Sequence, residues 1–216
     1  DVGAYQADRI IVVSNVLKGF LLEHWRGITE DKIIVMPNAA DVKRLQTPDD
    51  PSDIRRKHHV DEKIVIGFLG TFQPWYGLEH LIGAFPKILQ QVPNARLLLV
   101  GDGHFREDMM DQAEKLGLGE AVIFTGYIPH EEVPQYLSLF DIAVAPYRDL
   151  DTGFFNSPIK LFEYMAAGRA IVASNIGQIP EVVDHEQTAL LVEPGDDKQM
   201  ADAIIRLIRD VDLRTK

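Results

Sequence analysis

The residues with the clearest chemical potential lie in one short stretch, NSPIKLFE, residues 156–163. Ser157 and Pro158 suit the N-cap and the first position of a helix, whose free N–H groups and positive dipole end would attract an anion. Lys160 and Glu163 lie about one turn apart and share a face of that helix. Lys160 would then bind a diphosphate, and Glu163 would accept hydrogen bonds from sugar hydroxyls. A surface ion pair between the two is the alternative.

A second candidate is the loop GTFQPWYG, residues 70–77, between an apolar run and an amphipathic segment. Its glycines would let the backbone at Gly70 and Thr71 approach a phosphate, although neither G-x-G-x-x-G nor a Walker lysine is present. The alternative is a tight strand–helix turn in which Trp75 caps the core. The loop GDGH, residues 101–104, resembles half of a dinucleotide fingerprint, but its surroundings do not match that motif, and we expect His104 to be a solvated loop residue.

A third candidate is the loop GYIPH, residues 126–130. Tyr127 and Ile128 have the shapes needed to sandwich a flat base, with ordinary packing at the sheet edge as the alternative. All of these loops follow apolar runs, and open parallel sheets bind ligands at the carboxyl ends of their strands. We therefore expect the loops to meet at one edge of a sheet.

The elements that position these loops alternate along nearly the whole chain, which predicts an α/β fold with a Rossmann-like parallel sheet covered by helices on both faces. Gly117 and Gly168 mark helix ends. The predicted strands are Arg9–Ser14, Lys32–Met36, Lys63–Gly70, Arg96–Gly101, Ala121–Thr125, Ile142–Ala145, Ala170–Ala173 and Ala189–Val192. The predicted helices are Val16–Trp25, Leu78–Gln91, Phe105–Leu116, Glu132–Leu139, Ile159–Ala167, Ile179–Val183 and Lys198–Asp210.

The interval from Pro37 to about Asp53 is rich in proline and acidic residues, and we interpret it as a hinge. Residues 1–40 form a piece too small to bury its own faces, which predicts the tail end of a preceding lobe plus the hinge. Residues 41–216 form the predicted main domain. The start at Asp1, without an initiator Met, favours a piece of a longer protein.

Composition excludes several classes of function. The net charge of -11 argues against a nucleic-acid partner, and the absence of cysteine excludes disulfide scaffolds and thiolate metal sites. We find no apolar run long enough for a transmembrane segment and no signal-peptide pattern at the N-terminus. We expect a cytoplasmic protein.

These motifs together resemble the retaining GT-B glycosyltransferases of the group 1 (family 4) type, and the resemblance runs almost end to end. ADRIIVVS and KIIVMPNAAD resemble the end of that family's N-terminal acceptor lobe and the linker. LLLVGDG, VIFTGYIPHEEVPQYL, DIAVAPY, KLFEYMAAGRAIVASNIGQIPEVV and ALLVEPGD resemble its C-terminal lobe, which binds the nucleotide-sugar donor.

The resemblance implies transfer of a hexose-like sugar from an NDP-sugar to a hydroxyl acceptor on a glycan, lipid or small molecule. It implies no cofactor and no metal, and it leaves peripheral membrane association of the full-length protein open. The catalytic residues would lie in the N-terminal lobe, mostly outside this chain, so this piece alone would be inactive. The matching donor-binding residues are Gly70 and Thr71 near the diphosphate, Tyr127 and Ile128 at the base, Asn156, Ser157, Pro158 and Ile159 at the phosphates and sugar, and Glu163 at the ribose.

The sequence departs from the family at three positions. Phe155 stands at the place of the first glutamate of the paired-glutamate motif, and Thr71 and Tyr76 stand near the places of two basic residues. Lys160 is the expected replacement for that positive charge, and Asp151 is a candidate for the absent carboxylate. Gly177 and Glu181 are expected to support the fold. A non-catalytic nucleotide-sugar-binding protein and an epimerase of the same fold stay open as alternatives.

Overall fold

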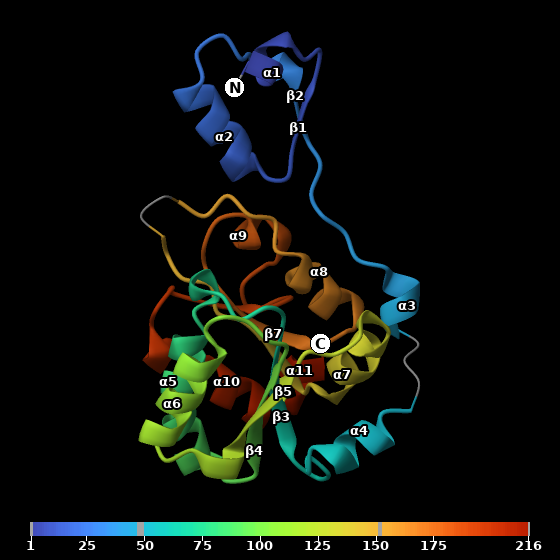
Figure 1. Cartoon of the computed structure of the whole chain (residues 1–216), viewed down its shortest axis with the longest axis vertical. Coiled ribbons are helices and arrows are strands. Elements are labelled where there is room, and N and C mark those ends of the chain that lie inside the picture. The colour runs from blue at the N-terminus through green and yellow to red at the C-terminus, as the bar shows by residue number, and fades with distance from the viewer. Residues whose placement is uncertain (1, 47–49, 151–152, 216) are drawn as a thin grey trace.

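The chain forms a six-stranded parallel sheet with helices on both faces, and an N-terminal segment with its own two-stranded sheet (Figure 1). The computed structural model describes residues 2–46, 50–150 and 153–215. The large sheet confirms the predicted α/β class and its parallel strands.

The six strands of the large sheet lie within one residue of their predicted ends. They are apolar because helices cover them on both sides. Their bounds are β3 Ile64–Leu69, β4 Ala95–Val100, β5 Val122–Gly126, β6 Ile142–Ala145, β7 Ala170–Ser174 and β8 Leu190–Val192.

The strand order is β5-β4-β3-β6-β7-β8, and every pair is parallel. The strand of this sheet that comes first in the sequence, β3, therefore lies at the centre, and the winding reverses between β3 and β6. Such a reversal opens a crevice at the carboxyl ends of the two strands, which is where ligands bind in doubly wound sheets.

Alternate residues of the central strands belong to two separate cores. Ile66 and Phe68 of β3 point to one face, whereas Val65 points to the other. The first face is covered by α5 Leu78–Gln91, α6 Arg106–Lys115, α10 Asp197–Arg209 and α11 Val211–Thr215. The second is covered by α3 Val42–Gln46, α4 Ser52–Lys57, α7 Val133–Leu139, α8 Ile159–Ala166 and α9 Ile179–Val182. Burial of these two apolar layers is the main source of stability.

The N-terminal segment has a small core of its own around Val12, Leu21, Ile28 and Ile33. Its strands pair in parallel. An extended linker joins it to the larger domain, and α2 lies above α9 and the loop that precedes α8 (Figure 1). Its elements are α1 Val2–Gln6, β1 Ile10–Val12, α2 Asn15–His24 and β2 Ile33–Val35.

Helices occur where the sequence predicted only a hinge. Both α3 and α4 lie in or next to the interval 37–53, and Leu45 of α3 is buried in the second core. Short helices of five or six residues carry too little periodicity to show in the sequence and are held by tertiary packing instead. The same reason explains why α1 and α11 were not predicted. Short 3-10 turns at Glu30–Lys32, Pro74–Tyr76, Gly119–Ala121 and His130–Glu132 complete the described elements.

Candidate donor-binding site

A cavity of about 530 Å³ opens at the carboxyl ends of β3 and β6, at the point where the winding of the sheet reverses. It brings together most of the residues that the sequence predicted for a binding site. Its lining consists of Val13, Asn38, Leu69, Gly70, Thr71, Tyr76, Tyr147, Asn156, Ser157, Pro158, Ile159, Lys160 and Glu163.

Gly70 directly follows β3 and lets the chain pass close to two neighbours. Its φ of 148° is a conformation that residues with a side chain rarely adopt. A Cβ atom at this position would lie 2.9 Å from Nζ of Lys160, and one at Gly101 would lie 2.0 Å from the carbonyl oxygen of Gly70. The two glycines therefore allow these segments to approach each other closely, whereas the approach of Gly70 and Thr71 to a phosphate stays a prediction. Thr71 follows as an exposed residue on the rim.

The start of α8 differs from the predicted capping arrangement. The helix begins at Ile159, and Pro158 occupies the N-cap position without a side-chain cap. Ser157 instead bonds to the linker: its Oγ accepts from the backbone N–H of Asn38 at 3.1 Å, and its carbonyl accepts from Nδ2 of Asn38 at 2.7 Å. The N-cap prediction for Ser157 is therefore wrong, because a partner distant in sequence takes its hydroxyl.

Lys160 is buried, with only 6% of its surface exposed. Its Nζ has no hydrogen-bond partner in the part of the chain that the structure describes, so it does not form the alternative ion pair with Glu163. Burial holds the pKa of Lys160 well below its ordinary value, against the opposing charge of Glu163. A buried amine without a polar partner at a cavity wall is suited to receive an anion.

Glu163 lines the same cavity one turn further along α8. Burial raises the pKa of its carboxyl group. Positive charges oppose this shift, those of His130 first and then those of Lys160 and Arg44. His130 and Arg44 lie side by side, with Nη1 of Arg44 2.6 Å from Nε2 of His130.

Tyr127 and Ile128 do not line the cavity. Tyr127 follows β5 at the same edge of the sheet, and 81% of its surface is exposed. Ile128 is half-buried and packs against the second core, as the alternative interpretation predicted.

Trp75 is exposed and does not cap the core, whereas Phe72 of the same loop is buried. His104 is exposed, as predicted. Asp151 lies outside the described residues.

Several cavity residues were not predicted from the sequence. Tyr76 and Tyr147 contribute aromatic rings, and Val13 and Asn38 come from the N-terminal segment and the linker. The sequence could have indicated Tyr147, because it follows shortly after a strand that ends at the same edge of the sheet. No comparable pattern in the sequence indicated Val13 or Asn38, because they come from outside the large sheet.

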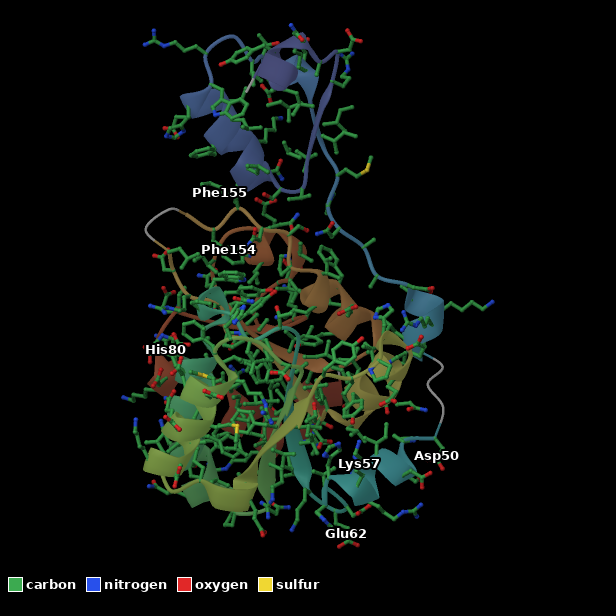
Figure 2. The ribbon with its side chains drawn as sticks, in the orientation of Figure 1. Asp50, Lys57, Glu62, His80, Phe154 and Phe155 are labelled. Atoms are coloured by element: carbon green, nitrogen blue, oxygen red, sulfur yellow. The ribbon has the colours of Figure 1, made fainter. Side chains whose placement is uncertain are left out.

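The N-terminal segment contacts the loop before α8 and the start of α9. Phe155 packs against Phe20, and Figure 2 shows Phe155 on the side of the domain that faces the segment. Oε2 of Glu181 accepts from Nδ2 of Asn15 at 2.9 Å, and Nε2 of Gln178 donates to the carbonyl of Val13 at 2.6 Å. Gly177 has a φ of 57° and packs against Phe154, in line with its expected structural role. Glu181 also has a structural role, since its side chain joins the larger domain to the N-terminal segment.

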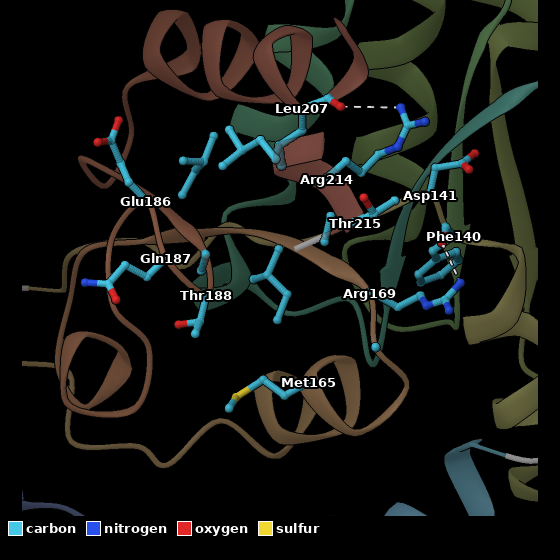
Figure 3. Close-up of a pocket in the computed structure, with 16 residues that line it drawn as sticks. Phe140, Asp141, Met165, Arg169, Glu186, Gln187, Thr188, Leu207, Arg214 and Thr215 are labelled. Atoms are coloured by element: carbon cyan, nitrogen blue, oxygen red, sulfur yellow. Dashed lines mark hydrogen bonds between the residues drawn. The ribbon is translucent and has the colours of Figure 1, made fainter. Parts of the chain in front are cut away.

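A larger cavity of about 650 Å³ lies at the opposite ends of the strands, between α8, α10 and α11 (Figure 3). Its most prominent charged group, Arg169, already donates to the carbonyls of Ala167 and Phe140 at 2.9 and 3.1 Å. Because the amino ends of parallel strands are not where doubly wound sheets bind ligands, we assign the candidate site to the smaller cavity.

The sheet order and the cavity at its reversal define the class: a Rossmann-like domain of the kind that forms a lobe of a GT-B glycosyltransferase. The family model "Glycosyl transferases group 1" matches residues 63–210, and the chain belongs to this family. The predicted resemblance is thereby confirmed.

Three relatives illustrate the similarity. The GDP-mannose-dependent alpha-(1-6)-phosphatidylinositol monomannoside mannosyltransferase of Mycobacterium tuberculosis is 30% identical over 180 residues, which cover 82% of this chain and 47% of that protein. The structure of Anabaena HepE in complex with UDP has a TM-score of 0.84 and 26% identity, over 97% of this chain and 56% of HepE. The C-terminal domain of LpcC, a glycosyl transferase group 1 family protein from Francisella tularensis, has a TM-score of 0.70 and 24% identity over 82% of this chain and 92% of that domain.

This chain therefore spans about half the length of the curated relatives that it matches. Among the described residues, no helix is long and apolar enough to cross a membrane.

Proposed function

We propose that this chain is the donor-binding lobe of a retaining glycosyltransferase, which transfers a hexose-like sugar from an NDP-sugar to a hydroxyl acceptor. The observation that carries the proposal is the meeting of Gly70, the start of α8, Lys160 and Glu163 in one cavity at the reversal of the sheet. HepE, a structural neighbour, was crystallised with UDP and with UDP-glucose, which supports a nucleotide-sugar as the ligand class.

The roles of the side chains follow from their chemistry. The amine of Lys160 would bind the diphosphate beside the backbone of Gly70 and Thr71, together with the free N–H groups at the start of α8. Asn156, Ser157, Pro158 and Ile159 would hold the phosphates and sugar through this backbone. The carboxylate of Glu163 would accept from two ribose hydroxyls. Tyr127 and Ile128, at the edge of the same crevice, would contact the base.

The leaving diphosphate carries the negative charge that develops in the transition state. Lys160 and the helix dipole are placed to stabilise it, and we propose that no metal ion is required for that step. We expect the groups that act on the acceptor in the preceding lobe, so that this chain alone binds donor without transferring sugar. We further propose a cytoplasmic location.

Thermal-shift measurements with UDP-, GDP- and ADP-sugars test donor binding, because a ligand that binds only the folded state raises its stability. At a concentration 100 times the dissociation constant, the gain is about 2.7 kcal/mol. We expect one nucleotide class to raise the melting temperature and Glu163→Ala to lose the response. An unchanged melting temperature with all three classes would contradict the proposal.

A non-catalytic nucleotide-sugar-binding protein is the second candidate. It is favoured by Phe155, whose ring packs against Phe20 at a position where the family places a carboxylate. Sugar transfer to an acceptor by the longer protein would support the enzyme, whereas binding without transfer would support the second candidate. Epimerisation of the donor without acceptor would indicate an epimerase of the same fold.

A further inference from the structure

Three aromatic rings surround the amine of Lys160. Its Nζ lies 3.2 Å from the centroid of the Tyr76 ring, 4.0 Å from that of Phe68 and 5.5 Å from that of Tyr147. These rings come from β3, from the turn before α5 and from the segment after β6, three parts of the chain that meet only in the fold.

The rings of this group also support one another. Tyr76 contacts Phe68 with centroids 5.7 Å apart and Tyr147 with centroids 5.3 Å apart. Tyr76 is thus the central member, and it fixes the side of the cavity on which the lysine side chain can lie. Gly70 also lies next to the amine, since a Cβ atom there would contact Nζ.

The ionisable groups that line the cavity with Lys160 are Glu163, Tyr76 and Tyr147. Burial raises the pKa of the Tyr147 hydroxyl well above its ordinary value, so this group stays neutral near pH 7. The Glu163 carboxylate is the remaining negative charge, and no hydrogen bond joins it to Nζ. Aromatic faces attract a cation, but they replace only part of the hydration that a buried ammonium loses.

We propose that Tyr76 is a positioning residue that holds the buried amine of Lys160 in place at the cavity wall, and that binding of a diphosphate is accompanied by net proton uptake at this amine. This inference rests on the proposed function. The proton comes from solvent and adds to the lone pair of Nζ, and the resulting ammonium donates to a phosphate oxygen. Donor binding then becomes weaker as the pH rises above the pKa of the free enzyme's Lys160.

Proton uptake is measurable by isothermal titration calorimetry of the 216-residue chain with UDP, GDP and ADP. Titration at about pH 8, where a nucleoside diphosphate is itself fully ionised, in buffers of different ionisation enthalpy gives the number of protons taken up. We expect net proton uptake on nucleotide binding, because a neighbouring phosphate favours the charged amine. Lys160→Met should abolish the proton uptake, whereas Glu163→Gln should leave it unchanged. The two variants therefore show which of the two side chains takes up the proton.

Two substitutions of Tyr76 test its positioning role. Tyr76→Phe keeps the ring and should keep both affinity and uptake. Tyr76→Leu removes the ring that positions the amine and admits water to it, so that the amine carries its proton before the nucleotide binds. We expect reduced uptake. We also expect an affinity about tenfold weaker, because the ammonium is no longer held where it donates to the phosphate and one charge-assisted hydrogen bond is lost.

The possible failures are distinguishable. If no nucleotide binds the unsubstituted chain, the proposed function fails, and this inference fails with it. Nucleotide binding without proton uptake overturns the inference and leaves the function intact. Equal uptake and affinity in Tyr76→Leu would overturn the role of Tyr76. If Tyr76→Leu does not fold, uptake by the unsubstituted chain and by Lys160→Met still decides the protonation of Lys160, and Tyr76→Met replaces it as the test of the ring.

Discussion

The rings of Phe20 and Phe155 pack against each other with their centroids 4.5 Å apart, and this contact joins the N-terminal segment to the loop before α8. A neighbouring hydrogen bond also joins the N-terminal segment to this loop, since Oγ of Ser14 donates to the carbonyl of Phe155 at 3.4 Å.

The first prediction concerns the energy of this aromatic contact. In a double-mutant cycle of Phe20→Leu and Phe155→Leu, we expect a coupling energy of about 0.5–1.5 kcal/mol, as for other aromatic pairs. Hydrogen exchange of the α2 amides measures it, because this segment can open without unfolding the large sheet. Strictly additive effects would show that the two rings do not stabilise the contact.

The second prediction is that Lys160 lowers the stability of the folded chain while it strengthens nucleotide binding. Lys160→Met removes a buried amine that has no hydrogen-bond partner among the described residues, and we expect the free energy of unfolding to rise by about 1–3 kcal/mol near neutral pH. Nucleotide affinity should fall in the same variant. Urea denaturation measures the first effect and calorimetry the second.

The difference in the free energy of unfolding between Lys160→Met and the unsubstituted chain should change with pH in a definite direction. The pKa of Lys160 is lower in the folded chain than its value of 10.5 in the unfolded chain, so the unfolded state binds more protons between the two values. The unsubstituted chain therefore gains stability as the pH rises through this window, and the advantage of Lys160→Met should shrink. An advantage that grows with pH would contradict the lowered pKa.

A third prediction concerns Tyr164, whose hydroxyl oxygen accepts the backbone N–H of Leu69 at 3.0 Å, directly before Gly70. Tyr164 is fully buried. Tyr164→Phe leaves this N–H without a partner and should cost about 1–3 kcal/mol in urea denaturation. Tyr127→Phe is the matched control, because its hydroxyl is on an exposed side chain and should change stability by less than about 0.5 kcal/mol. Equal effects of the two substitutions would contradict this reasoning.

The fourth prediction concerns Gly70. Gly70→Ala places a Cβ atom 2.9 Å from Nζ of Lys160 and strains a backbone with a φ of 148°, so both stability and nucleotide affinity should fall. Gly19→Ala is the control: it lies inside α2 with nothing within 4 Å of the new Cβ, and it should stabilise the chain by about 0.5–1 kcal/mol. Thermal denaturation and calorimetry of both variants check the two effects.

The large sheet and most of the cavity could be predicted from the sequence. Strands such as Ile142–Ala145 are continuous apolar runs, and Gly70, Lys160 and Glu163 follow or begin elements whose places in a parallel sheet are fixed by general rules. These features could be predicted because each depends on a pattern of residues that are close together in the sequence.

The remaining features depend on contacts between distant segments. Ser157 looked like a helix cap, but Asn38 takes its hydroxyl from 119 residues away. Tyr76 looked like a lost basic residue, and only the fold shows its ring 3.2 Å from Nζ of Lys160. Tyr127, expected at the base, lies outside the cavity.

The two bonds between Asn38 and Ser157 have a mechanical consequence for the linker. They fix the chain from residue 38 onward to the loop before α8, and Leu45 of α3 anchors it again in the second core. A rotation of the N-terminal segment about the larger domain must therefore be absorbed by Met36 and Pro37, between the end of β2 and Asn38. Because proline has a fixed φ, few torsion angles remain for that motion, and the pivot directs it along a narrow range of paths.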